Sequence, residues 1–259
     1  MFKKCFCSIA FRGEPLEAII PKLAAIGYDG IEVWGNHLGG RSDADVLALR
    51  KLATENRLDI EVLSPYFWLT RDLPELEAQS LATAARFVHL ATLLGAPKIR
   101  TFVDAGPDGI GSAAATPAHW NRAVGHLKTI TAMAPGILFA METHAHTLAD
   151  TPASTLRLLD RVGAPNLKVL YQPEASHTIE NYRRLRPHVV HLHLQNTGAN
   201  GGPGYLEEGL VDFPGLFREL AADGYAASLS VEYCWPGVTW TRAQSAYAYL
   251  MAKSAMGAA

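Results

Sequence analysis

Short apolar runs alternate with longer amphipathic runs along the whole chain. Apolar runs bounded by turn residues are typical of buried strands, whereas apolar residues repeating at i, i+3 and i+4 indicate helices. In 14–26, for example, Leu16, Ile20 and Leu23 share one stripe, and Gly27 follows as a helix stop. The predicted strands are Cys5–Ala10, Gly30–Trp34, Asp59–Ser64, Lys98–Val103, Gly136–Glu142, Leu167–Tyr171, Val189–Leu194 and Ala227–Glu232. The predicted helices are Glu14–Ile26, Asp43–Glu55, Pro74–Leu94, Pro117–Ala134, Thr151–Val162, Ile179–Leu185, Phe213–Asp223 and Thr241–Met256.

Strict alternation of strands with helices, without strand hairpins, predicts a parallel α/β sheet with right-handed crossovers. Eight such units are the number that closes a (β/α)8 barrel, and the length of 259 residues suits one such domain spanning 1–259. An open doubly wound sheet is the alternative, but no Gly-x-Gly-x-x-Gly follows the first strand. Two glycine-rich loops, 104–116 and 196–212, follow the fourth and seventh strands, at the end of a barrel where binding loops lie.

Composition narrows the class of protein. Hydrophobic residues make up 49% of the chain and charged residues 19%, which is enough to bury a core. A formal net charge of −2 disfavours nucleic acid as a partner. The chain shows neither a signal-peptide pattern nor an apolar run long enough to span a bilayer, so we expect a soluble cytoplasmic protein that does not bind membranes.

Polar residues at successive strand ends carry the chemical signal. Glu142 ends the fifth strand, Gln172 follows the sixth, His193 lies on the seventh and Glu232 ends the eighth. Neighbouring strands of a barrel bring these ends together, so the four side chains are predicted to meet at one point. Two carboxylates, one imidazole and one amide oxygen suit one divalent metal ion: Mn²⁺ first, with Mg²⁺, Co²⁺ or Zn²⁺ as alternatives.

Further polar and aromatic residues near strand ends are candidates for substrate contacts. His144 shares a face with Glu142 and is a candidate general base or substrate contact. Arg100 either holds the substrate or forms an ion pair with Glu32 or Glu142, and Glu32 either binds a sugar hydroxyl or pairs with that arginine.

Two residues complete the predicted substrate side. Trp34 forms either an apolar wall for a small substrate or part of the core. His177, in the loop after the sixth strand, is either a site residue or simply exposed. We expect a small-molecule substrate.

The chain resembles a known superfamily over nearly its whole length. It is similar to the xylose isomerase-like TIM barrels, also described as sugar phosphate isomerases and epimerases, and its motifs look closest to the bacterial 3-dehydroshikimate dehydratases. The segments that carry the resemblance are Cys7–Arg12, Gly30–His37, Ile99–Phe102, Met141–His144, Thr147–Pro152, Leu185–Pro187 and Glu232.

The resemblance implies roles for individual residues. Glu142, His193 and Glu232 match family metal ligands, and the matches at His144 and Arg100 imply proton transfer and substrate binding. At the sixth strand the family usually has aspartate where this chain has Gln172. A neutral amide adds no charge, so we expect the metal to be held less tightly.

Another departure bears on the reaction. A lysine of the dehydratases on the seventh strand is matched here by Gln195. The resemblance therefore leaves three hypotheses. The first is a metal-dependent isomerase or epimerase of a small hydroxy-carbonyl compound, in which Glu142 and Glu232 exchange a proton with the substrate through an enediolate and His144 is an alternative base. The second is a lyase of the 3-dehydroshikimate dehydratase type, and the third is a non-catalytic subunit with a degenerate site. Relatives are commonly dimers or tetramers, which makes a homo-oligomer an open alternative.

Overall fold

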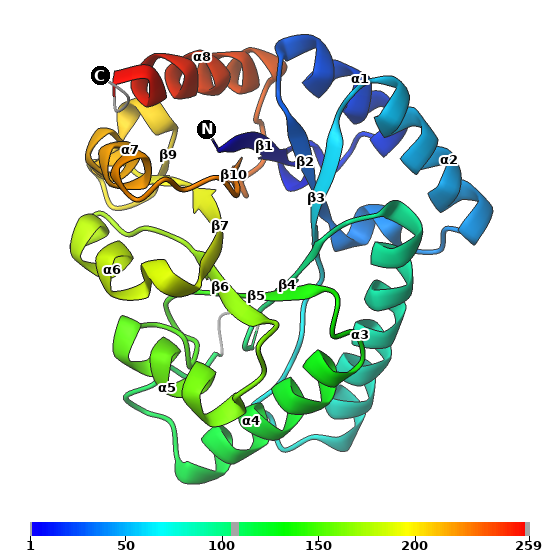
Figure 1. Cartoon of the computed structure of the whole chain (residues 1–259), viewed down its shortest axis with the longest axis vertical. Coiled ribbons are helices and arrows are strands. Elements are labelled where there is room, and N and C mark those ends of the chain that lie inside the picture. The colour runs from blue at the N-terminus through cyan, green and yellow to red at the C-terminus, as the bar shows by residue number, and fades with distance from the viewer. Residues whose placement is uncertain (1, 105–108, 257–259) are drawn as a thin grey trace.

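Eight parallel strands form a closed barrel surrounded by helices (Figure 1). This computed structural model describes residues 2–104 and 109–256. The barrel order is β1-β10-β7-β6-β5-β4-β3-β2. Its strands are β1 Lys3–Cys7, β2 Gly30–Trp34, β3 Asp59–Ser64, β4 Lys98–Thr101, β5 Leu138–Glu142, β6 Leu167–Tyr171, β7 Val189–Leu194 and β10 Ser228–Val231. The predicted (β/α)8 TIM-barrel fold is therefore confirmed.

The helices follow the strands as the amphipathic runs predict. The α-helices are α1 Leu16–Ile26, α2 Asp43–Glu55, α3 Pro74–Leu94, α4 Pro117–Ala132, α5 Pro152–Val162, α6 Thr178–Leu185, α7 Phe213–Ala222 and α8 Trp240–Met256. Short 3₁₀ helices are η1 Ser8–Phe11, η2 Gly35–Leu38, η3 Arg186–His188 and η4 Leu206–Glu208. Among the described residues, none of these helices has the length and apolar character needed to cross a membrane.

Local chemistry sets several of these boundaries. Helix α1 stops at Gly27 and helix α3 at Gly95, both with positive φ, a backbone region that glycine enters without a steric penalty. Helix α5 begins after Thr151, whose hydroxyl accepts a hydrogen bond from the backbone N–H of Ser154. Several predicted boundaries were off by one or two residues, and the largest error is in the first strand, which ends at Cys7 where the chain turns into η1 at Ser8.

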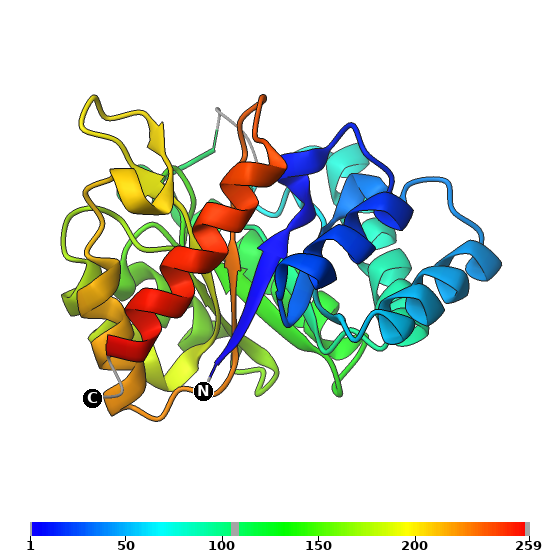
Figure 2. The same cartoon turned by 90° about the horizontal axis from the view of Figure 1, so that it is seen from above.

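The two glycine-rich loops lie at the carboxyl ends of their strands. Residues 105–108 of the first loop lie outside the described part of the chain. The second loop contains a short antiparallel hairpin of β8 (Asn196–Thr197) and β9 (Pro203–Gly204). Figure 2 shows this hairpin projecting at one end of the barrel, whereas the N-terminal start of β1 lies at the other end.

The main hydrophobic core lies between the barrel and the helices. Strand residues on the outward face, such as Val33, Ile99 and Met141, belong to one continuous apolar cluster with the helices. The inward face is different, because it carries buried charged and polar side chains. Lys98 Nζ lies 2.6 Å from Glu61 Oε2 inside the barrel, near the amino ends of the strands. Buried polar and charged side chains therefore take the place of the layers of branched apolar residues that usually fill the interior of such barrels.

Candidate active site

The four predicted metal ligands meet at one point, where oxygens of the other three lie close to His193 Nδ1. That nitrogen lies 3.4 Å from Glu142 Oε1, 3.1 Å from Glu232 Oε2 and 3.3 Å from Gln172 Oε1. Glu142 is the last residue of β5, and Gln172 and Glu232 directly follow β6 and β10, so the closed barrel brings the strand ends together. The ligand atoms of Glu142, His193 and Glu232 lie within 4.8 Å of one another. The donor set therefore fits one divalent ion that accepts oxygen and imidazole ligands.

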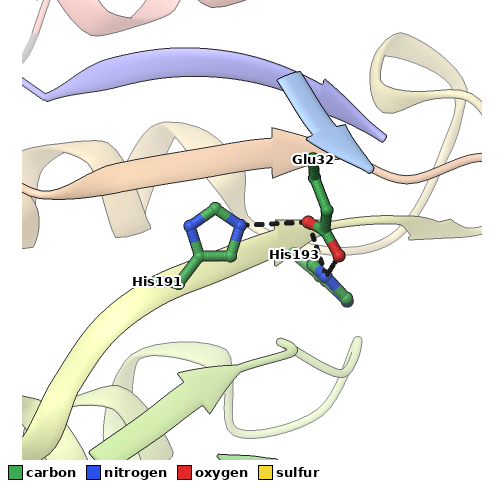
Figure 3. A group of neighbouring side chains, drawn as sticks. All are labelled: Glu32, His191 and His193. Carbon is green, nitrogen blue, oxygen red and sulfur yellow. Dashed lines mark hydrogen bonds and ion pairs between the residues drawn. The ribbon is translucent and has the colours of Figure 1, made fainter. Parts of the chain in front are cut away.

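The other ring nitrogen of His193 contacts a buried carboxylate from the opposite side of the barrel. Its Nε2 lies 3.0 and 3.1 Å from the two oxygens of Glu32, on β2 (Figure 3). A metal-bound histidine usually donates its second N–H to a carboxylate or carbonyl, which fixes the ring orientation and leaves the first nitrogen as the ligand. Glu32 is placed to accept the N–H of His193 Nε2, which leaves Nδ1 as the nitrogen that can bind a metal.

Glu32 is itself held by further hydrogen bonds. Its Oε2 lies 3.1 Å from His191 Nε2, and its Oε1 accepts from the hydroxyl of Ser64. His191 also contacts Ser228 and Ser230 and is fully buried, so it has a structural role in the barrel interior. Glu32, His191 and His193 also lie within 4.8 Å of one another. Because Glu32 lies at hydrogen-bond distance from both histidines, we interpret these three residues as a group that supports the predicted metal ligands.

The buried carboxylates control the protonation of the site. Burial opposes a charge on His193, but the negative charges of Glu232, Glu32 and Glu142 outweigh it and raise the pKa of the imidazole well above its ordinary value. The surrounding carboxylates therefore favour the protonated form of His193 when no cation is bound. A cation binding at Nδ1 would displace that proton, as metals do when they bind histidine.

Arg100 bridges the two outer carboxylates. Its NH1 lies 3.1 Å from Glu142 Oε2 and 3.8 Å from Glu232 Oε1, so each carboxylate has one oxygen near His193 and the other near this guanidinium. Its NH2 donates to the carbonyl oxygen of Pro65. Burial disfavours the charge of Arg100, yet Glu142 and its neighbours keep its pKa above the ordinary value. Of the alternatives considered for Arg100, the ion pair with Glu142 is present, and contact with a substrate stays a prediction.

A cavity of about 370 Å³ opens at the carboxyl ends of the strands above these groups. His144 lies on its wall, with its ring centroid 5.1 Å from that of Phe102. The guanidinium of Arg100 stacks over Phe102 at 5.3 Å and over Tyr66 at 4.7 Å. The described lining residues are Tyr66, Arg100, Phe102, Asp104, Glu142, His144, Ala145, His146, Gln195, Glu232 and Cys234.

Three residues predicted at the substrate side lie outside this cavity. Glu32 is completely buried behind His193, where it binds the two strand histidines and not a substrate hydroxyl. Trp34 packs edge-on against His37, with ring centroids 5.4 Å apart. His177 is exposed at the start of α6 and pairs with Glu180 at 3.2 Å. Side-chain alternation puts Glu32 and Trp34 on one face of β2, but it does not show how far each lies from the cavity.

Other cavity residues were not selected as site residues from the sequence. Tyr66, Phe102 and Asp104 follow β3 and β4, so they carry the same strand-end signal as the predicted ligands. His146 and Cys234 follow β5 and β10 in the same way. A search that extended four residues beyond each strand would have found all five.

Comparisons with known proteins agree with this architecture. The family model described as "Xylose isomerase-like TIM barrel" matches residues 20–252. A curated 3-dehydroshikimate dehydratase of Bacillus anthracis is 27% identical over 264 residues, covering 88% of this chain and 90% of that protein.

Two solved structures show the same fold. A probable 3-dehydroshikimate dehydratase from Bacillus anthracis has a TM-score of 0.84 at 24% identity, over 96% of this chain and 99% of that one. An L-ribulose 3-epimerase has a TM-score of 0.83 at 20% identity, over 99% of this chain and 96% of that one. Both a dehydratase and an epimerase are therefore among the proteins that this chain resembles.

Proposed function

The chain belongs to the xylose isomerase-like TIM barrel family, and we propose that it is a divalent-metal-dependent isomerase or epimerase of a small hydroxy-carbonyl compound such as a ketose. One observation carries the proposal: three side-chain oxygens, from Glu142, Gln172 and Glu232, surround His193 Nδ1, and Glu142 and Glu232 also line the cavity. Similarity to an L-ribulose 3-epimerase supports the substrate class.

Glu142, Gln172, His193 and Glu232 would hold the metal. When bound, such an ion supplies a Lewis acid that polarises a substrate carbonyl and favours loss of the neighbouring proton. Mn²⁺ is our first candidate, and Mg²⁺, Co²⁺ and Zn²⁺ fit the same donors. Gln172 contributes an oxygen without a charge, so we expect weaker binding than a third carboxylate would give.

The two carboxylates are placed to move the substrate proton. Glu142 and Glu232 approach His193 Nδ1 from neighbouring positions, and Arg100 contacts the second oxygen of each. In our proposal one carboxylate takes the proton from carbon and the other returns it on the opposite face. Burial opposes the charge of Glu142, but Arg100 and His193 hold the pKa of that carboxyl below its usual value, so it is an acceptor at neutral pH. His144, on the cavity wall, is the alternative base.

A 3-dehydroshikimate dehydratase is the second candidate. The similarity to the Bacillus anthracis enzyme and the presence of Arg100 in the cavity favour it. This reaction would share the first proton transfer and then expel hydroxide from the β-carbon. It is distinguished by its product, since dehydration of 3-dehydroshikimate creates an aromatic ring with a new ultraviolet absorbance.

Metal content and product analysis test the proposal together. Purified protein is assayed by elemental analysis and then incubated with neutral ketoses and, separately, with 3-dehydroshikimate. We expect about one metal ion per chain and isomerised ketose, with both lost in Glu142→Gln and His193→Ala. His177→Ala, an exposed change outside the cavity, is the matched control. An aromatic product would favour the lyase, and folded protein without metal or turnover would favour the non-catalytic hypothesis.

A further inference from the structure

Asp104 is a buried residue of the cavity lining, and one oxygen of its carboxyl group lacks a hydrogen-bond partner among the described residues. It follows β4 by three residues and is 1% exposed. Its Oδ1 accepts hydrogen bonds from the backbone N–H groups of Leu69, at 2.7 Å, and Thr70, at 3.1 Å. Its Oδ2 is buried and has no hydrogen-bond partner within residues 2–104 and 109–256. A buried oxygen without a partner is costly, so it indicates a group that is satisfied only when something else binds.

The backbone of Asp104 supports the same interpretation. Its φ is +77°, a region that side-chain-bearing residues rarely adopt. Such strain persists where the surrounding structure holds a side chain in a particular place, and it is common at binding sites. Since Oδ1 secures the turn at Leu69 and Thr70, the carboxyl plane is fixed and Oδ2 has a defined direction.

The charges of the cavity identify what such an oxygen would bind. Among the described lining residues the carboxylates are Asp104, Glu142 and Glu232, and the only guanidinium or ammonium group belongs to Arg100. That cation is already committed to the two glutamates and to the carbonyl oxygen of Pro65. A substrate carboxylate at the Asp104 end would meet a like charge, whereas a hydroxyl group would donate a hydrogen bond.

We propose that Asp104 is a specificity-determining residue, whose Oδ2 accepts a hydrogen bond from a hydroxyl of a neutral polyhydroxylated substrate and disfavours substrates that carry a carboxylate. The inference rests on the proposed function and narrows it, because it selects neutral ketoses over acids such as 3-dehydroshikimate. Burial raises the pKa of Asp104. The backbone N–H groups of Thr70 and Leu69 and the charges of Arg71 and His119 lower it, but burial outweighs them. A hydroxyl donor would stabilise the charged form that burial now penalises.

Equilibrium binding tests the inference without requiring turnover. Wild-type protein and Asp104→Asn, each in excess Mn²⁺, are titrated by calorimetry with L-ribulose, a neutral ketose, and with shikimate, a stable hydroxylated carboxylate. Asparagine keeps an oxygen for Leu69 and Thr70 but replaces Oδ2 with an N–H donor. Asp72→Asn is the matched control, since Asp72 is an exposed residue paired with Arg122 at 2.6 Å.

We expect the wild type to prefer L-ribulose, and Asp104→Asn to bind it about tenfold or more weakly while shikimate binding improves. Thermal unfolding of Asp104→Asn should match that of the wild type. Unchanged L-ribulose affinity in the folded variant would overturn the inference, as would a wild type that binds shikimate more tightly or binds no L-ribulose. Product analysis is interpreted separately. If the two proteins bind the ligands as expected but no isomerised ketose forms, the proposed reaction is wrong and the proposed role of Asp104 is unaffected.

Discussion

Replacing Glu32 with glutamine should weaken metal binding although Glu32 is not itself a predicted ligand. Glu32 is fully buried, and it receives contacts from His193, His191 and Ser64. Glutamine is nearly isosteric but neutral, and it has one oxygen acceptor where the carboxylate has two. At least one of the three donors would then face an N–H group, and His193 would lose the charge that makes its imidazole a stronger ligand.

The size of the effect follows from these contacts. Loss of a carboxylate behind a metal-binding histidine typically weakens metal affinity about 10- to 100-fold, which is about 1.4 to 2.7 kcal/mol. We expect the upper half of that range, because both oxygens of Glu32 lie within 3.1 Å of His193 Nε2.

A competition titration measures this affinity directly. Wild type and Glu32→Gln compete with a chromophoric chelator for Mn²⁺, and thermal unfolding checks that each protein is folded. Ser64→Ala is the control, since it removes one donor to Glu32 but keeps the charge, and it should change the affinity by less than about threefold. If folded Glu32→Gln binds Mn²⁺ as tightly as Ser64→Ala, the carboxylate does not tune His193 and our account of the site is wrong.

Three further predictions test other parts of the molecule. Gln172→Asp adds a charge next to His193 and should tighten Mn²⁺ binding about tenfold or more in the same titration. Burial disfavours the charge of Glu61, but Lys98 and Lys3 outweigh this and lower its pKa to about 2. Its stabilisation is therefore present above its usual pKa of 4.5 and is lost as the pH falls through the folded value. Urea unfolding between neutral and acidic pH should show the wild type losing about 2 to 3 kcal/mol more than Glu61→Gln, and parallel curves would contradict this. His177→Ala should leave kcat/KM within about twofold of the wild type, because its side chain pairs with Glu180 outside the cavity; a larger loss would return His177 to the site.

Much of the fold and part of the site could be predicted from residue order alone. Alternation of apolar and amphipathic runs is set by local periodicity, so the order of strands and helices followed from it. Gly27 and Thr151 marked helix ends through purely local chemistry. The ends of β5, β6, β7 and β10 identified His193 and the three residues whose oxygens surround its Nδ1, because parallel strands of a barrel end at the same face.

Contacts across the barrel depended on the tertiary structure. The first strand ends at Cys7 because Ser8 turns inward, where its hydroxyl accepts from the backbone N–H of Trp34 and contacts His37 Nδ1. Side-chain parity shows which face a residue occupies, but not its depth or its partner on a distant strand. For that reason Glu32 was expected at the substrate and lies behind His193. The unused oxygen of Asp104 likewise exists only because a separate loop supplies the N–H groups that hold its carboxyl group in place.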